Sequence, residues 1–456
     1  MAQPPGPTSP PALQTLRYLA QPEEFQRGCH RRNGDVFSIT TVIFGPEVCV
    51  VRPEVIKKVF TGDSDELRAG EANIALEPLL GMKSVLLLDG AEHLRQRRLM
   101  MPPFHGERMF AYAHTMREIA ERMVASWPVG RQFTLHKHMQ KLTLEIILRT
   151  IFGVDEGAQM DELGAAIARL LDVAAEPLTM VGTTAPFRKN LWGLSPWARV
   201  QRALRSADKL IYEVISRRRA EIEAKAPART DVLSMLLTAR DDKGEAMTDA
   251  ELRDELVTLL AAGHETTATE LCWALDAILD SPRVVARLQD EIRDATNDAG
   301  VLAMDRLPYL DATLKEVLRL HPVIPAVARR VKVPMVVGGF DIPAGMLLVP
   351  GVWLTHRLPD IYPEPDEFRP ERFLDAKPDP YAWLPFGGGV RRCLGMAFAL
   401  FEMKVVLATV LARVRLRRAS TEPTRAMLRA FTHAPRGNVP VIVEERIREK
   451  PRASAS

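Results

Sequence analysis

The residue with the most distinctive chemistry is Cys393, which stands in the glycine- and arginine-rich stretch FGGGVRRCLG between Phe386 and Gly395. A cysteine binds a metal as the thiolate, and a buried thiolate needs compensating positive charge and hydrogen bonds. The glycines allow backbone amides to approach the sulfur closely, and Arg391 and Arg392 bring positive charge beside it. This combination indicates a thiolate metal ligand, because a structural cysteine needs neither feature.

A second candidate site lies in a long helix predicted after the capping box formed by Thr248 and Glu251. The helix is apolar on most sides, but its middle carries the polar segment GHETT over 263–267. Ala262 and Thr266 share one helix face, and the Thr266 hydroxyl can donate a hydrogen bond to the Ala262 carbonyl. A polar break in a buried helix indicates a functional groove. Taken alone, the segment could instead be a polar patch that faces a neighbouring loop, with no functional groove.

The elements that must position these residues indicate a mainly α-helical protein with small β-sheets. The sequence predicts a hairpin over 36–51, broken at Gly45-Pro46, and a helix over 53–60. A largely helical region over 92–320 is followed by short strands over 330–350 and a long ordered loop over 359–392. The last helix is expected over 395–415 and a final strand near NVPVIVEE. Residues 1–12 are expected to be a disordered or extended tail, 13–448 a single large domain, and 449–456 a second tail.

Composition excludes several classes of protein. The chain has 456 residues, 46% of them hydrophobic and 26% charged, with a net charge of +3, so it is typical of a globular protein that does not bind nucleic acid. The four cysteines fit neither a disulfide framework nor a zinc site. The proline-rich start does not resemble a signal peptide, and no apolar run is long enough for a membrane anchor. We expect a cytoplasmic protein, and a monomer.

Five motifs together resemble the cytochrome P-450 family. The pattern F-x-x-G-x-R-x-C-x-G in 386–395 is similar to the haem-ligand signature of that family, and four other segments match further family motifs in the same order along the chain. These segments are His93-x-x-x-Arg97, AGHETT from Ala262 to Thr267, Glu316-x-x-Arg319, and FRPERF from Phe368 to Phe373. The resemblance covers residues from about 36 to 440. It implies a cytochrome P-450 fold, with a long central helix over the haem.

The resemblance also implies roles for individual residues. Cys393 would be the axial ligand of a haem b iron, and the haem contacts would be His93, Arg97, Arg329, Phe386, Gly387, Arg391 and Gly395. Arg330 is an alternative to Arg329. Glu265 and Thr266 would be the acid–alcohol pair that relays protons during oxygen activation. Glu316, Arg319 and Arg372 would form a buried ion-pair network behind the haem.

The activity implied by the resemblance is monooxygenation, in which one oxygen atom of dioxygen enters a C–H or C=C bond of a lipophilic molecule. The expected pocket walls are the segments 69–88 and 174–195, the loop around Phe431, and Leu259, Ala262, Val323 and Val327. Ordinary core packing is the alternative at each position. The two segments are mostly apolar, which favours a substrate oriented by shape. Similarity to bacterial family members points to a terpenoid, a steroid or a fatty acid.

Electrons must come from separate proteins, because the family motifs occupy the whole chain. The resemblance implies a ferredoxin and its NAD(P)H-dependent reductase, with a basic docking patch of Arg95, Arg98, Arg392 and Lys404. Two rival functions keep the haem. A peroxide-using peroxygenase would lack the pair Glu265–Thr266, and a non-catalytic haem-binding sensor would need no proton relay.

Overall fold

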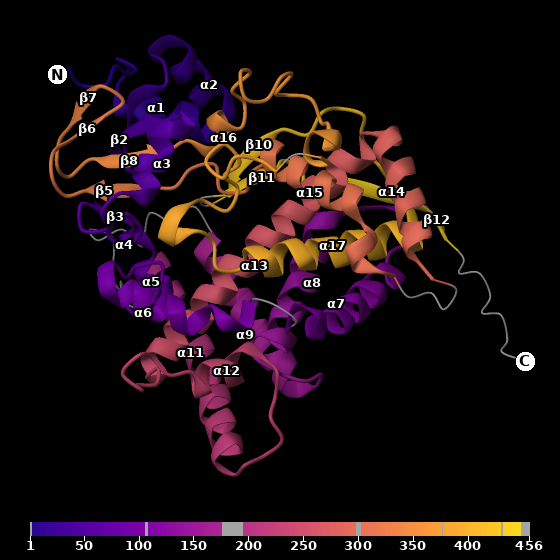
Figure 1. Cartoon of the computed structure of the whole chain (residues 1–456). Coiled ribbons are helices and arrows are strands. Elements are labelled where there is room, and N and C mark those ends of the chain that lie inside the picture. Colours follow the sequence, from indigo (N-terminus) through magenta and orange to yellow (C-terminus); the bar gives the residue numbers. More distant parts are fainter. Residues whose placement is uncertain are drawn as a thin grey trace, which may run out of the picture.

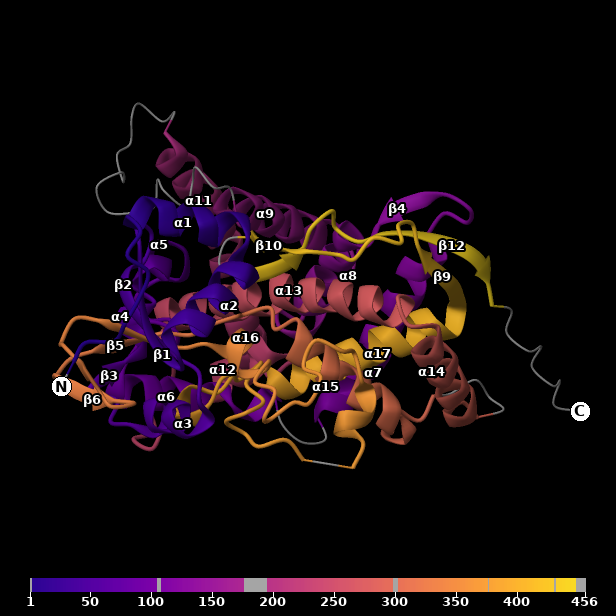
Figure 2. The same cartoon turned by 90° about the horizontal axis from the view of Figure 1, so that it is seen from above.

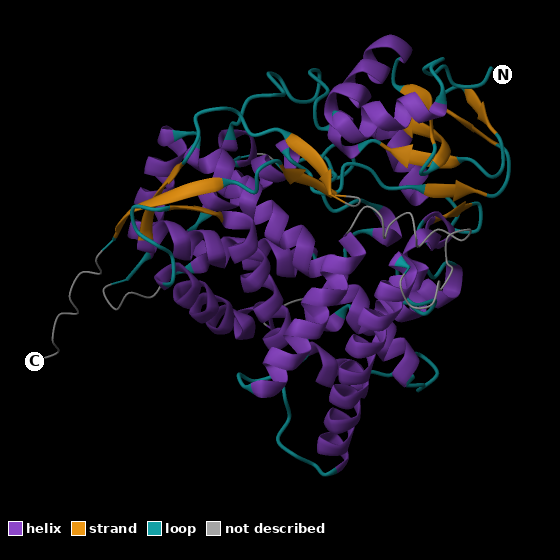
Figure 3. Cartoon of the chain, turned by 180° about the vertical axis from the view of Figure 1, so that it is seen from behind, coloured by secondary structure: helices purple, strands orange, loops and turns teal. Residues whose placement is uncertain are grey.

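The computed structural model describes residues 2–104, 108–175, 195–297, 302–375, 377–429 and 432–447. Most of these residues are helical, and the strands lie toward the periphery (Figure 3). The helices are α1 (Pro11–Ala20), α2 (Pro22–Asn33), α3 (Pro53–Thr61), α4 (Ala69–Ala72), α5 (Glu77–Leu80), α6 (Gly90–Met100), α7 (Arg108–Ala125), α8 (Leu135–Thr150), α9 (Ala158–Ala175), α11 (Pro196–Glu223), α12 (Val232–Thr238), α13 (Asp249–Leu279), α14 (Pro282–Ala295), α15 (Pro308–Leu320), α16 (Val352–Thr355) and α17 (Met396–Arg413).

The helix α13 runs through the middle of the molecule, as Figures 1 and 2 show. It has 31 residues and packs against α8, α11, α15 and α17. Thr248 and Glu251 form the capping box that the sequence predicts, with the Thr248 amide 2.7 Å from Oε2 of Glu251. Because neighbours surround it, α13 buries residues on most sides, including Cys272 and Trp273.

The strands form four small sheets. Their bounds are β1 (Val36–Thr41), β2 (Gly45–Val50), β3 (Leu67–Arg68), β4 (Gln132–Thr134), β5 (Arg329–Val331), β6 (Met335–Val337), β7 (Phe340–Ile342), β8 (Leu347–Pro350), β9 (Val414–Arg418), β10 (Ala426–Arg429), β11 (Thr432–Pro435) and β12 (Pro440–Arg446). The largest sheet has the order β1-β2-β8-β5-β3, and only its β2–β8 pair is parallel. It lies beside α1 and α3, at the N-terminal end of the molecule (Figure 1). A three-stranded sheet has the order β4-β12-β9, and two hairpins pair β6 with β7 and β10 with β11.

The predicted hairpin over 36–51 is present, but its turn is not at Gly45-Pro46. Gly45 and Pro46 already pair with Thr41 and Thr40, so the turn consists of residues 42–44. Gly45 has φ 78°, a conformation that glycine adopts without strain, and it begins the returning strand instead of breaking it.

The N-terminal segment is extended and hydrogen-bonded both to the large sheet and to the hairpin of β6 and β7. The Ser38 amide of the edge strand β1 donates to the Pro5 carbonyl at 2.8 Å, and the Asp341 amide of β7 donates to the Ala2 carbonyl at 3.2 Å. The following helix α1 begins at Pro11, inside the range expected to be a tail. Its buried Gln14 donates to the Ser9 carbonyl at 2.7 Å, so the segment is fixed at both ends.

Between β8 and α17 the chain forms the long loop that the sequence predicts over 359–392. Its described part contains only short helical turns, at Pro370–Phe373 and Gly389–Arg391. The loop leads directly into α17, which lies alongside α13 (Figure 1). No helix among the described residues has both the length and the apolar character needed to cross a membrane.

Candidate active site

The loop that carries Cys393 is held in place by α3. Gly389 has φ 63°, and a side chain there would lie 2.1 Å from the Phe60 carbonyl oxygen, while a Cβ on Gly388 would lie 2.6 Å from the Phe60 ring. The Cys393 amide closes the loop by donating to the Phe386 carbonyl at 2.9 Å. These two glycines therefore permit close packing on α3. Sequence reasoning had assigned the glycines to the sulfur instead.

The Cys393 side chain is exposed, while the other three cysteines are buried. Desolvation by the surrounding protein raises the pKa of its thiol, and the Gly395 amide with the charges of Arg97 and Arg392 opposes that rise. The two observations agree if the sulfur faces a space that protein largely surrounds. Arg97 extends from α6 toward this sulfur, so one residue links the cysteine loop to the first of the predicted haem-binding motifs.

Four cationic or basic side chains converge beside this loop. Burial and the charges of Arg391, Arg97 and Arg329 lower the pKa of His93 to about 3, which places all three guanidinium groups near one imidazole. Burial likewise lowers the pKa of Arg329 and of Arg391 to about 10. The only carboxylate paired with this group in the described structure is Asp89, whose Oδ1 lies 2.6 Å from Arg391. The cluster thus has more positive than negative charge and is suited to anionic groups.

Arg329, and not its neighbour Arg330, belongs to this cluster. The Arg329 side chain is buried, lies over the Phe60 ring at 5.3 Å, and donates only to the neighbouring Ala328 carbonyl at 2.9 Å among the described residues. Arg330 points to the other side of β5 and donates to the Gly345 carbonyl at 2.6 Å. Consecutive side chains of a β-strand point to opposite faces, so Arg329 and Arg330 lie on opposite sides of β5.

On α13, Thr266 makes the hydrogen bond that the sequence predicts. Its Oγ1 donates to the Ala262 carbonyl at 2.5 Å. Ala262 is exposed, and Leu259 and Thr266 are half-buried, so this helix face is open while most of α13 is buried. His264 points the other way, where its Nδ1 lies 2.8 Å from Thr143 Oγ1 of α8. A single polar segment therefore both lies at an accessible face of α13 and ties α13 to α8.

Glu265 is bound by residues that sequence reasoning missed. Its Oε1 lies 3.1 Å from His136 Nε2 and its Oε2 accepts from Gln140 at 2.8 Å, both on α8. Arg429 of β10 lies 3.4 Å from Oε1. Burial alone would raise the pKa of Glu265, but the hydrogen bonds of His136 and Gln140 and the charge of Arg429 lower it to about 2. No motif marks these partners, because they lie 125 to 164 residues from Glu265 in the chain.

Glu316, Arg319 and Arg372 meet in one buried network. Arg319 donates to both Glu316 oxygens at 2.8 Å, and neither side chain is exposed. Arg372 lies 3.3 Å from Glu316 Oε1. Arg319 also donates to the carbonyls of His356 and Pro365, at 2.9 and 2.7 Å, so the network fixes the long loop before Cys393.

The remaining predicted residues have mixed environments. Phe386 packs edge-on against Trp383, with ring centroids 5.9 Å apart, while Gly387 has φ 66° and Gly395 precedes α17. Val327 is half-buried, and Val323 is buried where its carbonyl accepts from the His433 amide at 2.8 Å. Most of the expected pocket segment 174–195, and Phe431, lie outside the described residues.

The expected basic docking patch is largely paired with carboxylates. Arg95 binds Asp241 and Glu251 at 2.6 and 2.7 Å, Arg98 binds Asp242 at 2.7 Å, and Lys404 binds Asp311 at 2.9 Å. Within the described chain, Arg392 is the one member of the patch without a carboxylate partner.

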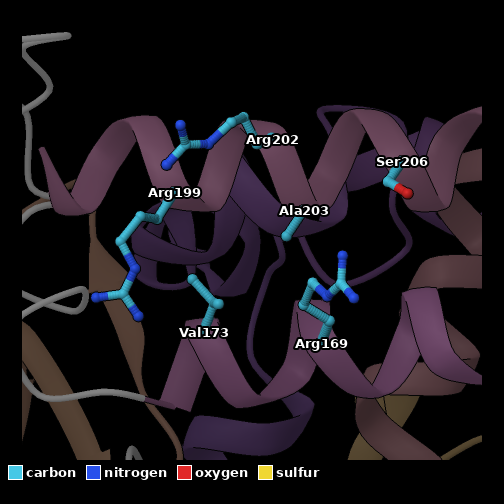
Figure 4. A pocket seen from close by; sticks show the side chains of 6 residues that line it. All are labelled: Arg169, Val173, Arg199, Arg202, Ala203 and Ser206. Atoms are coloured by element: carbon cyan, nitrogen blue, oxygen red, sulfur yellow. The ribbon is translucent and has the colours of Figure 1, made fainter. Parts of the chain in front are cut away.

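A separate groove of about 260 Å³ lies between α9 and α11 (Figure 4). Three arginines, Arg169, Arg199 and Arg202, surround it. None of the predicted site residues lines this groove, so it is distinct from the candidate site.

The fold, the exposed Cys393 thiol and the polar segment of α13 are those expected of a haem-thiolate protein, and the comparisons with known proteins agree. The family model of cytochrome P-450 matches residues 4–439, so this chain belongs to the cytochrome P-450 family, whose members are haem-thiolate monooxygenases. Two relatives from Mycobacterium tuberculosis are similar along almost their whole length. Cytochrome P-450 135B1 is 40% identical, with 95% of this chain and 90% of the relative covered, and cytochrome P-450 138 is 36% identical, with 97% and 96% covered.

Solved structures show the same fold. The heme domain of cytochrome P450DA has a TM-score of 0.83 and 25% identity, covering 98% of this chain and 99% of that one. The retinoic acid-bound cyanobacterial CYP120A1 has a TM-score of 0.82 and 24% identity, covering 98% and 100%.

The residues present fit the haem that the family implies. An exposed cysteine in a loop held by α3 offers a single thiolate ligand, and no cluster of three metal-ligating side chains competes with it among the described residues. The excess positive charge of Arg97, Arg329 and Arg391 matches the two carboxylates of a haem. Haem supplies the redox chemistry, and the chain must bind it, exclude water and move protons.

Proposed function

We propose that this protein is a monooxygenase in which Cys393 ligates the haem iron, and which hydroxylates or epoxidises a lipophilic small molecule. The observation that carries the proposal is the exposed Cys393 thiol beside the cluster of Arg97, Arg329 and Arg391. In this arrangement the positive charges of the arginines would stabilise both the thiolate and the propionates of the haem. His93 belongs to the same cluster and can donate a hydrogen bond to a haem carboxylate.

The chain's own residues have separate tasks in the proposed reaction. Thr266 presents a hydroxyl at the open face of α13, and the Ala262 carbonyl orients it. Glu265 is the acid of the proton relay. Phe386 and Trp383 shield one side of the cysteine loop from water. Glu316, Arg319 and Arg372 act at a distance, because they hold the loop that carries Cys393.

The substrate is proposed to be a terpenoid, a steroid or a fatty acid. Leu259, Ala262 and Val327 are apolar and partly accessible, which supports a substrate selected by shape. One protein of the same fold, the cyanobacterial CYP120A1, has been solved with retinoic acid bound, which supports a lipophilic substrate. Electrons would come from NAD(P)H through a ferredoxin and its reductase, with Arg392 as the cationic residue left free to contact the donor. Free thiols throughout the described chain support a reducing cytoplasm.

Two experiments test the haem site. The reduced, CO-bound protein should show the red-shifted Soret band of a thiolate-ligated haem, and Cys393→His should abolish that band while haem remains bound. A band typical of imidazole ligation in the folded wild type would overturn the proposal. Arg329→Leu should weaken haem retention, whereas Arg330→Leu, the matched control on the opposite side of β5, should not.

The substrate class is tested by a panel of terpenoids, steroids and fatty acids, each added to the ferric protein. A compound that binds beside the haem would shift the spectrum from low to high spin, and only compounds that give this shift should be oxidised. Product formation with hydrogen peroxide alone, at the rate obtained with a ferredoxin system, would instead support the peroxygenase alternative. The presence of Glu265 and Thr266 argues against it. If no compound is oxidised under either condition, the result would favour the other alternative, a non-catalytic haem-binding sensor.

A further inference from the structure

One peptide segment joins the first half of α13 to the cysteine loop. The Val85 amide donates to Glu255 Oε1 of α13 at 2.9 Å, and the Val85 carbonyl accepts from Arg391 Nη1 of the cysteine loop at 3.0 Å. A carboxyl group of the central helix and a guanidinium beside Cys393 are therefore bound to the same residue, one at its amide and the other at its carbonyl.

The two residues before Val85 are also bound by α13. The Lys83 amide donates to Asp254 Oδ2 at 2.9 Å, and Ser84 Oγ lies 2.7 Å from Thr258 Oγ1. Asp254 and Thr258 are both buried, so water competes little for these contacts. The path of the chain just before α6 is therefore fixed by α13.

The same segment directs the Arg391 guanidinium. Besides its bond to the Val85 carbonyl, Arg391 donates from Nη2 to the Leu88 carbonyl and to Asp89 Oδ1. These acceptors engage both terminal nitrogens, while Arg391 Nε donates to no residue in the described part of the chain. A planar guanidinium held in this way presents its remaining N–H groups in a fixed direction. Residues 85–89 thus determine where Arg391 can meet an anionic group.

Glu255 is suited to be a neutral acceptor. It is fully buried, and burial raises its pKa well above the usual value, with Asp254 and Glu251 adding to the rise. Its Oε2 has no hydrogen-bond partner among the residues that the structure describes. A carboxyl group in such a site is more stable protonated, and its Oε1 can still accept from the Val85 amide. A glutamine at this position would keep both the shape and the acceptor.

We propose that Glu255 is a positioning residue for the haem: by holding Val85, it keeps Arg391 directed at a haem carboxylate. In the described structure Glu255 makes no hydrogen bond or ion pair with the cysteine loop itself, so its effect on the haem passes through the Val85 segment. The role toward the haem rests on the proposed function, whereas the bridge through Val85 does not.

The bridge is tested by amide hydrogen exchange of the peptide that contains Val85, measured by mass spectrometry. Glu255→Leu removes the acceptor and should raise the exchange rate of this peptide about tenfold, because the Val85 amide loses a buried hydrogen bond. Glu255→Gln should exchange like the wild type. Glu270→Leu is the matched control, since Glu270 is another buried glutamate of α13 and its two oxygens have no partner among the described residues.

The effect on the haem is tested by the rate at which haem passes from the ferric protein to an excess of apomyoglobin. Glu255→Leu should lose haem about tenfold faster than the wild type, whereas Glu255→Gln and Glu270→Leu should not. Adding Arg391→Gln to Glu255→Leu should increase the rate by less than the product of the two single effects, because both changes act on one contact. Thr258→Val is the milder variant in case Glu255→Leu fails to fold, and should raise both rates in the same direction.

The outcomes separate the bridge from the haem role. Unchanged exchange in both Glu255→Leu and Thr258→Val would show that α13 does not hold Val85. Faster exchange with unchanged haem loss would show that Arg391 keeps its direction without Glu255, and fully multiplicative effects with Arg391→Gln would equally overturn the positioning role. A protein that binds no haem would defeat the proposed function and the haem role together, while hydrogen exchange would still decide whether the bridge exists.

Discussion

Arg391 and Asp89 form an ion pair in which Nη2 and Oδ1 lie 2.6 Å apart. The pair joins the cysteine loop to the start of α6, and Asp89 also accepts from the Gly70 and Glu71 amides at 2.9 and 3.1 Å. Only about a tenth of either side chain is exposed, so water replaces little of this interaction if one partner is lost. One aspartate thus connects three segments of the site.

Asp89→Asn should lower the free energy of unfolding by about 1.5–3 kcal/mol, because a hydrogen bond to a charged group is lost. The measurement is chemical denaturation of the haem-loaded protein. Asp65→Asn is the matched control, since Asp65 is largely exposed and lies 3.4 Å from Arg68. Equal losses for both variants would show that the buried pair contributes nothing particular.

Glu316→Ala should yield little haem-loaded protein. It leaves Arg319 buried with no carboxylate, at a cost of about 3–5 kcal/mol, and releases the loop before Cys393. The ratio of Soret to protein absorbance after purification measures the effect, and Glu54→Ala on the exposed side of α3 is the control. Normal haem content in Glu316→Ala would refute the structural role of this network.

Thr266→Ala should consume NAD(P)H but form much less product, with hydrogen peroxide released instead. The variant loses the hydroxyl that the Ala262 carbonyl orients, and a positioned proton donor is worth about 10²-fold or more in rate. Product and peroxide are measured together per NAD(P)H. Thr266→Ser keeps the hydroxyl and should retain most of the coupling, so a similar loss in both variants would contradict the assignment.

His356 should make the protein sensitive to acid. Its Nε2 accepts from the Leu384 amide at 2.7 Å and its Nδ1 lies 3.0 Å from the Arg319 carbonyl, so the ring is neutral. Burial and the charge of Arg319 lower its pKa from 6.5 to about 3. Below pH 6.5 the unfolded chain therefore binds a proton that the folded protein does not, and stability should fall by up to about 1.4 kcal/mol per pH unit until about pH 3.

Denaturation midpoints measured from pH 7 downward test this prediction. His356→Gln keeps an acceptor and a donor but does not titrate. The slope of its free energy of unfolding against pH should therefore be smaller than that of the wild type, by up to the contribution of one bound proton. An unchanged slope would mean that His356 is protonated in the folded protein or that other buried histidines dominate.

The sequence predicted those parts of the fold that depend on local patterns. The capping box at Thr248 located the start of α13, and Pro53 located the start of α3. The hairpin turn was misplaced, because a glycine next to a proline usually marks a turn. At Gly45-Pro46 the positive φ is instead needed where the second strand begins.

The candidate site was predictable wherever its residues lie within one motif. Thr266 and Ala262 are four residues apart, so helical geometry alone predicts their hydrogen bond. The partners of Glu265 were not predictable, because α8 and β10 approach α13 only in the folded chain. The same reason explains why the contact of Gly389 with Phe60 was missed. Side chains that support a site from distant segments form no motif of fixed spacing that could be recognised in the sequence.

The proline-rich N-terminus has a consequence for how the large sheet ends. The strand β1 is an edge strand, and such an edge can pair with another molecule. The carbonyls of Pro4 and Pro5 accept from Ser38, and Gly6 passes so close to Ser38 that a side chain there would collide with it. Proline has a carbonyl acceptor but no amide donor, so Pro4, Pro5 and Pro7 offer an incoming strand no backbone donor. Residues 2–9 thus cover the edge of β1, and removing them would leave an exposed strand edge that can pair with another molecule.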